Sequence, residues 1–285
     1  MDIGKSKVMI TASIVAFHTQ HKDLSRLIDC VLQSPIERVY IIDNSTNDEL
    51  RDFVRNNPRI TYIHSLNLGY GAGHNIAIRK ALESGADYHV VLNPDIYWVG
   101  DVIGELAKFM DANPDVGQVM PKIVYPTGEV QYLCKLLPTP MDLIGRRFVP
   151  IKSYQERHDY EYELHWTGYD KVMEIPSLSG CFMFLRCSVL QDVGSFDERY
   201  FMYAEDLDLC RRVGAKSRTV FYPHVAVTHE YEKGSYKNRK LLKYHINSII
   251  KYFNKWGWFL DSERRDRNQK CLRALRQLKT DSAGN

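Results

Sequence analysis

The chain has 285 residues, 44% of them hydrophobic and 26% charged, which is typical of a soluble globular protein. No apolar run approaches the ~20 residues of a membrane-spanning helix, and the first residues lack the apolar stretch of a secretory signal, so we expect a cytoplasmic protein. The net charge of +3 is unevenly distributed: residues 233–285 hold 14 Lys and Arg against 4 Asp and Glu, whereas residues 1–232 hold 24 against 31.

The first half of the chain alternates between two hydrophobic patterns. Short runs rich in β-branched and aromatic residues predict strands at 9–17, 38–43, 60–64 and 88–93. The stretches between them predict helices at about 22–33, 47–56 and 74–84. Alternation at this spacing indicates an α/β fold with a mostly parallel sheet that is covered by helices.

Polar residues follow the carboxyl ends of these predicted strands. The first strand leads to Phe17, the second to Asp43 in "DNSTND", the third to the loop "NLGYGAGHN" that begins at Asn67, and the fourth to Asn93 and Asp95 in "NPD". Ligands of parallel sheets bind outside the carboxyl ends of the strands. Together these residues predict a nucleotide pocket at one edge of the sheet.

Two of these elements have a purely structural interpretation as well. Asp43 and Asn44 are residue types that form turns and cap the next helix. The glycines of "NLGYGAGHN" can cradle a phosphate with backbone N–H groups at a helix N-terminus, but glycines also serve plain turns. Their G-x-G-x-G spacing differs from the dinucleotide fingerprint G-x-G-x-x-G, which disfavours a nicotinamide-dependent oxidoreductase.

The tripeptide Asn93-Pro94-Asp95 ends the fourth predicted strand. Proline removes a backbone donor and fixes φ, so the strand stops and Asp95 is held in a set direction at the sheet edge. A carboxylate there suits a hard divalent cation, which prefers oxygen ligands and can bridge phosphates. The alternative is that the tripeptide only terminates the strand.

The middle of the chain is less regular. A helix is predicted at 101–112, followed by a strand ending in "GQVMP" and a hairpin around "YPTGE". Residues 138–174 then lose periodicity and are rich in Tyr, His and charge. A loop of that length in a compact domain is usually a lid or a mobile segment.

The segment 177–214 predicts a strand, a short helix, the turn "GSFDE" and a further helix. On that last helix Asp206 shares a face with Leu209, whereas Asp208 lies on another face, spaced for an ion pair with Arg212. We therefore expect Asp206 to point inward and Asp208 to face solvent. An inward carboxylate in the first turn is either a cap or a general base.

The six cysteines are scattered through the chain, mostly within apolar segments, and no two form a C-x-x-C pair. This usage predicts reduced core residues rather than disulfides or a zinc site. They are Cys30, Cys134, Cys181, Cys187, Cys210 and Cys271.

The motifs "SIVAFH", "IIDNSTND", "NLGYGAGHN", "LNPD", "GSFDERYFMYAEDLDLCRR" and "VTHE" occur in this order over residues 10–230. This set resembles the family 2 glycosyltransferases of the GT-A fold, and most closely their rhamnosyltransferase-like members. The resemblance implies a Rossmann-like, mostly parallel mixed sheet flanked by helices, with a C-terminal helical extension. It also implies an inverting enzyme of polysaccharide synthesis that uses a nucleotide-sugar, such as dTDP-rhamnose or a UDP-sugar.

The resemblance also implies roles for single residues. Asp206 would be the catalytic base, Asp95 would ligate Mg²⁺ or Mn²⁺, and His229 of "VTHE" would approach the metal or the diphosphate. The nucleotide-sugar would be bound at the strand ends by Phe17, Asp43, Asn67, Gly69, Gly71, Asn75 and Asn93.

One position departs from the family pattern. The metal motif of the wider family is Asp-X-Asp, and this chain has Asn93 in its first place, which leaves one carboxylate fewer for a cation. For His229 the structural alternative is a histidine that simply ends the strand "HVAVTH".

Two further functions remain open at this point. A nucleotide-sugar-binding module without transferase activity would keep the Asp43 pocket and tolerate loss of Asp206. A nucleotidyltransferase would want a basic phosphate grip near the first strand, where this chain has "AFHTQHK". None of these hypotheses includes a nucleic acid as partner.

The basic segment 233–285 is predicted to be a helical extension of a catalytic domain at 1–232. Its apolar residues recur at helical spacing: Leu242, Ile246, Ile249, Phe253, Trp256 and Leu260. In one interpretation this stripe packs on the catalytic domain and leaves the lysines, such as Lys255, in water. In the other it rests on the anionic inner face of the cytoplasmic membrane, with Trp256 and Trp258 at the interface. The family resemblance implies an acceptor held on polyprenyl diphosphate, which such docking would bring to Asp206.

Overall fold

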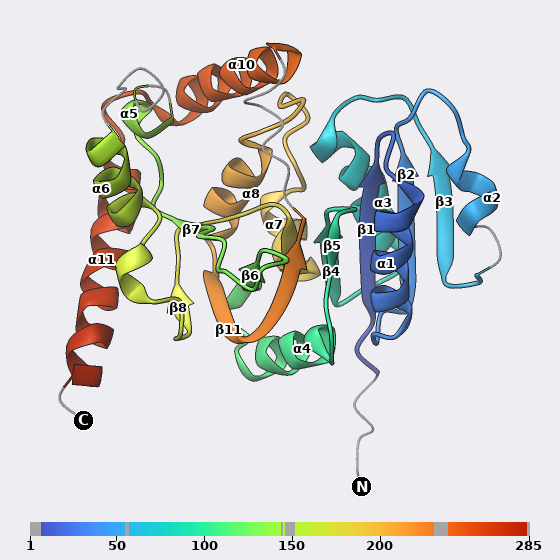
Figure 1. Cartoon of the computed structure of the whole chain (residues 1–285), viewed down its shortest axis with the longest axis horizontal. Helices are drawn as coiled ribbons and strands as arrows, with labels where there is room; N and C mark the ends of the chain where they lie inside the picture. Colours follow the sequence, from blue (N-terminus) through green and yellow to red (C-terminus); the bar gives the residue numbers. More distant parts are fainter. Residues whose placement is uncertain (1–6, 55–56, 144, 146–151, 231–238, 284–285) are drawn as a thin grey trace, which may run out of the picture.

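The computed structural model describes residues 7–54, 57–143, 145, 152–230 and 239–283. A nine-stranded mixed sheet flanked by helices forms its centre, with the strand order β3-β2-β1-β4-β10-β6-β11-β5 and β8 paired to β11 (Figure 1). The predicted α/β fold is therefore confirmed. Among the residues described, no helix combines the length and the apolar character needed to cross a membrane.

The first half of the sheet is parallel. Strands β1 and β4 are entirely buried and β2 nearly so, as expected where helices cover a parallel sheet, whereas the edge strand β3 is half-buried. The strands are β1 (Ile10–Ala16), β2 (Arg38–Asp43), β3 (Ile60–His64) and β4 (Tyr88–Leu92). They are connected by α1 (His21–Leu32), α2 (Leu50–Val54) and α3 (Tyr70–Glu83). In the register Ala16 pairs with Asp43 and Asp43 with His64, so these strands end at one edge.

The second half of the sheet is mixed. Strand β10 (Phe182–Arg186) is antiparallel to both β4 and β6 (Val116–Val124), and β11 (Arg218–His229) is parallel to β6. The short strands β5 (Ile96–Tyr97) and β8 (Met173–Glu174) are antiparallel to β11. The remaining elements here are β7 (Cys134–Lys135), which pairs with β9 (Ser177–Leu178), and the helices α4 (Val102–Ala112), α7 (Cys187–Val193) and α8 (Glu205–Val213).

Helix α3 begins at Tyr70 rather than near residue 74, so the predicted glycine loop is largely helix. Gly71 and Gly73 lie inside its first turn. Glycine is needed at both positions because the helix packs closely on its neighbours there. A Cβ on Gly71 would meet Phe196 at 2.9 Å, and one on Gly73 would meet Val15 at 2.8 Å. Glycine here permits close packing of a helix, a role that sequence cannot distinguish from a turn.

The segment 138–174 contains more helix than its sequence predicts. It holds α5 (Pro140–Leu143), α6 (Lys152–Tyr162) and the 3₁₀ helix η2 (His165–Thr167), while residues 144 and 146–151 lie outside the described part. Helix α6 is polar all round, so its sequence shows no apolar period. The role of this segment as a lid stays a prediction.

The basic extension forms two helices, α10 (Arg239–Trp256) and α11 (Ser262–Ala283). Figure 1 shows α10 lying above α8 at the upper edge of the molecule, while α11 contacts the segment before α5 through a hydrogen bond from the Leu137 N–H to Asn268 (2.8 Å). Ile249, Tyr252 and Phe253 of α10 are buried against Tyr200 and Leu207. The predicted boundary between residues 232 and 233 falls within 231–238, outside the described residues, so the division into two parts stays a proposal.

Buried charges join α8 to this extension. Arg211 of α8 is 1% exposed and donates two hydrogen bonds to Asp261, of 2.7 and 2.8 Å. Asp208 is fully buried and accepts hydrogen bonds from Lys255 (2.6 Å), Trp256 Nε1 (2.8 Å) and Arg212 (2.8 Å). We call this set of side chains the α8 clamp.

The α8 clamp confirms one prediction and corrects three. The ion pair between Asp208 and Arg212 is present. However, Asp208 does not face solvent, Lys255 is not left in water, and Trp256 is engaged with α8 rather than presented at the surface. The cause is long-range: α10 supplies a cation and an indole N–H to a helix face that looks polar and exposed in isolation. All six cysteines carry free thiols, as predicted.

Candidate active site

Asp43, at the end of β2, is enclosed by its own neighbours. Its carboxylate accepts hydrogen bonds from the Ser45 backbone N–H (2.9 Å) and from the Tyr62 hydroxyl (2.7 Å), and its side chain is fully buried. It therefore shapes the turn after β2 and does not cap α2. Phe17 and Asn67 are exposed at the rim of the same edge.

Asn75 is held in the interior. Its amide nitrogen donates to the Phe196 carbonyl (2.8 Å) and to Glu198 (2.9 Å), and its oxygen accepts from the Phe196 N–H (2.9 Å). Both ends of this carboxamide are thus bound within the protein. Asn75 thereby ties the turn "GSFDE" to α3, and a contact of this residue with a nucleotide-sugar stays a prediction.

Gly69 marks the entry to α3 and a close approach of two backbones. Its φ of 110° lies in the region that favours glycine, and a Cβ there would meet the Phe201 carbonyl oxygen at 2.2 Å. The next backbone N–H, of Tyr70, donates to the same carbonyl at 2.9 Å. The loop therefore packs against residues 196–205, which lead into α8.

Asn93, Asp95 and His229 meet at the end of β4, because β11 pairs with β5 directly after the "NPD" tripeptide. His229 Nε2 lies 3.4 Å from Asp95 Oδ2 and 3.5 Å from Asn93 Nδ2. Gln131 fixes the ring from behind: its amide donates to the His229 carbonyl (2.8 Å), and its oxygen lies 3.0 Å from Nδ1. Nδ1 therefore carries a proton, and Nε2 is the nitrogen directed at Asp95 and Asn93.

These three side chains fit a weak site for a hard divalent cation. Asp95 Oδ1 is buried and has no hydrogen-bond partner in the described part of the chain, which leaves an oxygen free for an ion. Over the same residues no group of three or more His, Cys, Asp and Glu has metal-ligand spacing. A cation here would have the Asp95 carboxylate and the His229 imidazole as ligands, with the rest coming from phosphate oxygens or water. Asn93 turns its Nδ2 toward His229 and would add an oxygen ligand after rotation of its carboxamide.

The electrostatics of His229 agree with its contacts. Burial lowers the pKa of the imidazole, but the facing Cys181 and Asp95 groups outweigh burial and raise this pKa to about 10. A cation that binds Nε2 must therefore displace a proton.

Asp206 lies in the first turn of α8, beside the peptide of Gly180. Its Oδ2 accepts from the Gly180 N–H at 2.8 Å, and its Oδ1 accepts from the Leu207 N–H at 2.8 Å. A Cβ on residue 180 would meet the Asp206 Cβ at 2.7 Å, so only glycine allows this approach. Burial raises the pKa of the Asp206 carboxyl above its ordinary value, which makes it a better proton acceptor.

The backbone before Asp206 is held in an unusual conformation. Tyr203 and Ala204 both have positive φ, of 69° and 65°, which bulky residues rarely adopt. The turn is fixed from α10, where Ser248 donates to the Met202 carbonyl at 2.8 Å. A strained turn held by a neighbouring helix sets the direction in which Asp206 points.

A chain of contacts connects the candidate cation site with Asp206. The Tyr70 hydroxyl lies 2.9 Å from Asn93 Oδ1 and 3.0 Å from the Gly180 carbonyl, and Gly180 in turn holds Asp206. The residues predicted as metal ligands and as base therefore belong to one site. Sequence patterns did not single out Tyr70, Gly180 or Gln131, because each acts through residues far away in the chain.

Glu205 is a further residue of interest, which helical spacing groups with Asp208 and Arg212 on the face predicted to be solvated. It is buried beside Asp206, and its Oε2 has no partner within the described residues. Burial, and then the charge of Asp206, raise the pKa of the Glu205 carboxyl well above its ordinary value. The "ED" pair thus places two buried carboxyl groups side by side, and Asp206 is the one that accepts hydrogen bonds from backbone N–H groups.

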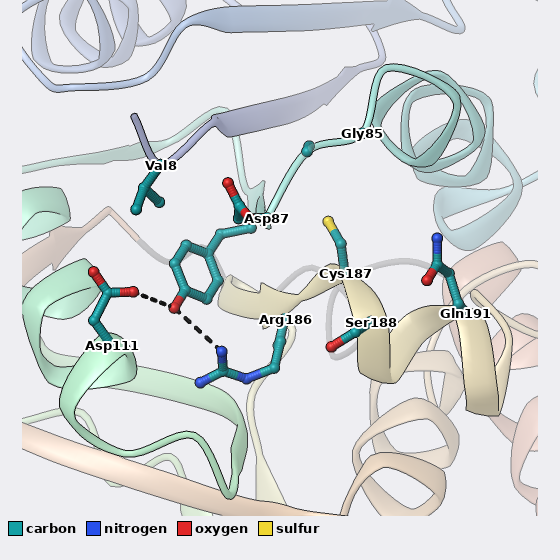
Figure 2. A pocket seen from close by; sticks show the side chains of 10 residues that line it. Val8, Gly85, Asp87, Asp111, Arg186, Cys187, Ser188 and Gln191 are labelled. Carbon is teal, nitrogen blue, oxygen red and sulfur yellow. Dashed lines mark hydrogen bonds between the residues drawn. The ribbon is translucent and has the colours of Figure 1, made fainter. Parts of the chain in front are cut away.

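A cavity of about 420 Å³ lies at the opposite edge of the sheet, at the start of β4 (Figure 2). The Tyr88 hydroxyl donates to Asp111 at 2.6 Å and accepts from Arg186 at 3.2 Å. The other nitrogens of Arg186 donate to backbone carbonyls. Arg186 and Asp111, which line this cavity, are therefore bound to other groups of the protein. The candidate catalytic and cation-binding residues lie at the opposite ends of the strands.

Two relatives of this chain are bacterial rhamnosyltransferases. The chain is 29% identical over 213 residues to N-acetylglucosaminyl-diphospho-decaprenol L-rhamnosyltransferase of Mycobacterium tuberculosis, covering 69% of this chain and 67% of the relative. It is 25% identical over 224 residues to the rhamnosyltransferase WbbL of Escherichia coli, covering 75% and 81%.

A solved structure has the same fold. The mannosyltransferase PcManGT of Pyrobaculum calidifontis, in complex with GDP-Man and Mn²⁺, superposes with a TM-score of 0.55 at 16% identity, covering 85% of this chain and 64% of that one. The family model described as Glycosyl transferase family 2 matches residues 13–194, which is more than half of the chain. This match shows that the chain is a glycosyltransferase and belongs to glycosyl transferase family 2.

Proposed function

We propose that this enzyme transfers a sugar from a nucleoside diphosphate to a saccharide held on polyprenyl diphosphate, with inversion of configuration at the anomeric carbon. Its place would be the synthesis of a cell-surface polysaccharide. The observation that carries the proposal is the chain of contacts from Asp95 and His229 through Tyr70 and Gly180 to Asp206. The names of the two bacterial relatives support rhamnose as the sugar, and therefore dTDP-rhamnose as the nucleotide-sugar.

The residues divide the reaction between them. The acceptor oxygen forms a bond to the anomeric carbon while the bond from that carbon to the diphosphate oxygen breaks. Asp206 takes the proton of the acceptor hydroxyl, and attack from the face opposite the diphosphate inverts the configuration. Asp95, His229 and Asn93 would hold Mg²⁺ or Mn²⁺, an ion that neutralises charge on a leaving diphosphate when it is bound.

The test of this function is a panel of dTDP-, UDP- and GDP-sugars with Mn²⁺, in which release of the nucleoside diphosphate is measured. We expect slow release from one nucleotide class, dTDP-rhamnose first, with faster release when a polyprenyl-linked saccharide is added. EDTA, which removes the divalent cation, should slow the release of the nucleoside diphosphate. Stabilisation by a nucleotide-sugar without release from any member would favour a binding module. Pyrophosphate formed from a nucleoside triphosphate and a sugar phosphate would favour a nucleotidyltransferase.

We further propose that the outer surface of the extension contacts an anionic membrane, at the inner face of the cytoplasmic membrane. Ile246 and Ile250 lie on the outer side of α10, and Phe259 and Leu260, 79% and 91% exposed, lie in the following loop. Exposed lysines such as Lys251 accompany them. Apolar side chains with cations beside them are the composition of a helix that lies in a membrane interface. These residues replace Trp256 as the expected anchors.

Exchange of Phe259 and Leu260 for Ser should release the protein from vesicles. Burying two large apolar side chains is worth about 3 kcal/mol or more, so we expect co-sedimentation with anionic vesicles at low salt to fall by at least about tenfold. Val99→Ser, at a side chain 93% exposed before α4, is the matched control and should change nothing. Equal sedimentation of the unmodified chain and the double variant would contradict the membrane contact.

A further inference from the structure

Tyr70 is the first residue of α3, and its hydroxyl lies between two acceptors. Asn93 Oδ1 is 2.9 Å away and the Gly180 carbonyl oxygen is 3.0 Å away. A phenolic hydroxyl carries a single hydrogen, so it donates to only one of them at a time. When the Asn93 carboxamide turns its oxygen toward Tyr70, the hydroxyl faces two acceptors with one hydrogen. Either Asn93 Oδ1 or the Gly180 carbonyl oxygen then receives no hydrogen bond from Tyr70.

Rotation of the Asn93 carboxamide by 180° removes this conflict. The amide nitrogen then donates to the Tyr70 oxygen, and Tyr70 donates to Gly180, so each hydrogen has its own acceptor. The oxygen and nitrogen of a carboxamide have nearly the same shape, and both orientations therefore fit the same space. The rotation exchanges the contact of Asn93 Nδ2 with His229, which is 3.5 Å long, for a contact near 2.9 Å.

The rotated carboxamide presents its oxygen to the candidate cation site. The position that faces His229 Nε2 is then an oxygen, and the same Nε2 lies 3.4 Å from Asp95 Oδ2. Asp95 Oδ1 is buried and finds no partner over the described residues. An amide oxygen beside a carboxylate is a ligand pair that hard cations accept.

Tyr70 is itself fixed. Its ring packs against His74 at 4.4 Å between centroids, and its backbone N–H donates to the Phe201 carbonyl at 2.9 Å. Burial raises the pKa of its hydroxyl well above the ordinary value, so the hydroxyl keeps its hydrogen at physiological pH.

We propose that Tyr70 is a positioning residue, which holds the carboxamide of Asn93 with its oxygen toward Asp95 and His229. The amide oxygen thereby takes the place of the first carboxylate of the Asp-X-Asp motif. The inference rests on the cation of the proposed function and adds a residue that acts on that cation through another side chain.

The test measures how strongly Mn²⁺ and a nucleotide promote each other's binding, without any turnover. The quantity is the dissociation constant of dTDP in EDTA divided by that in Mn²⁺, obtained by calorimetry. Tyr70→Phe should lower this ratio by about tenfold or more, the usual cost of losing a residue that orients a metal ligand. The dissociation constant in EDTA should stay unchanged, which also verifies that the variant is folded.

A second background separates orientation from other effects. Asn93→Asp has oxygens at both ends of the side chain, so its orientation no longer matters. In that background Tyr70→Phe should change the ratio by less than about threefold. Tyr222→Phe is the matched control, because its ring packs on Phe109 of α4, away from the site, and it should leave the ratio unchanged.

Two results would overturn the inference. One is that Tyr70→Phe lowers the ratio equally with Asn93 and with Asn93→Asp, and the other is that it does not lower the ratio in the chain that keeps Asn93. Asp95→Ala serves as the reference for loss of the ion and should bring the ratio close to one. If the unmodified chain already shows a ratio of one, the cation of the proposed function fails, and this inference fails with it. A ratio above one that Tyr70→Phe leaves intact rejects the inference alone.

Discussion

Exchange of Asp206 for Asn should lower sugar transfer by about 10² to 10⁴ and leave nucleotide binding nearly intact. The amide fills the same space and keeps an oxygen for the Gly180 N–H, which donates to Asp206 at 2.8 Å. It cannot accept the proton of the acceptor hydroxyl. The measurements are the initial rate with a saturating nucleotide-sugar and the dissociation constant of the nucleoside diphosphate.

The matched control for this variant is Asp192→Asn, on the exposed side of α7. It makes the same chemical change at the surface and should leave the rate within about twofold. If Asp206→Asn retains a rate within about tenfold of the unmodified enzyme, another group takes the proton. Glu205, buried beside it, would then be the next residue to exchange.

Removal of the Asp261 carboxylate should cost about 3–5 kcal/mol of unfolding free energy, because it leaves the guanidinium of Arg211 in the interior without its main partner. Arg211 is 1% exposed and donates to both oxygens of Asp261. Asp261 also accepts the Arg264 backbone N–H at 3.0 Å and so caps α11, which adds to the loss. The measurement is urea denaturation of Asp261→Ala.

Two comparisons test the cause of that loss. Glu105→Ala breaks an ion pair with Lys108 on the surface of α4 and should cost less than about 1 kcal/mol. Adding Arg211→Met to Asp261→Ala removes the unpaired charge, so the double variant should be more stable than Asp261→Ala. A loss below about 1 kcal/mol for Asp261→Ala would mean that the pair does not hold the extension in place.

The inner strands β1, β2 and β4 were predictable because they are buried on both faces, and the half-buried edge strand β3 was predictable from its β-branched and aromatic residues. Their β-branched runs are uninterrupted, and the predicted bounds of 38–43 and 60–64 are those of β2 and β3. The start of α3 was predicted wrongly, since Gly71 and Gly73 resemble a loop unless Phe196 and Val15 are known to press on them. Local sequence gives no access to that packing.

The candidate site shows the same division. Asp95 and Asp206 stand out because a carboxylate after a proline and one at a helix start are both local patterns. Their connection was not predictable, since it depends on the pairing of β11 with β5 and on the contact of Tyr70 with Gly180, 110 residues away. The burial of Asp208 was missed for the same reason, because Lys255 lies on a different helix.

The α8 clamp also implies an order of events while the chain is being made. Arg211 emerges from the ribosome 50 residues before Asp261, and Asp208 well before Lys255. Asp208 already has Arg212 of its own helix as a partner, but Arg211 cannot be buried before Asp261 is present, because an unpaired ion in the interior costs several kcal/mol. Helix α8 therefore docks only after α10 and the start of α11 have been synthesised. Asp206 lies in the first turn of this helix. The proposed base is therefore positioned only after the strands β1 to β4, which would bind the nucleotide-sugar, have been synthesised.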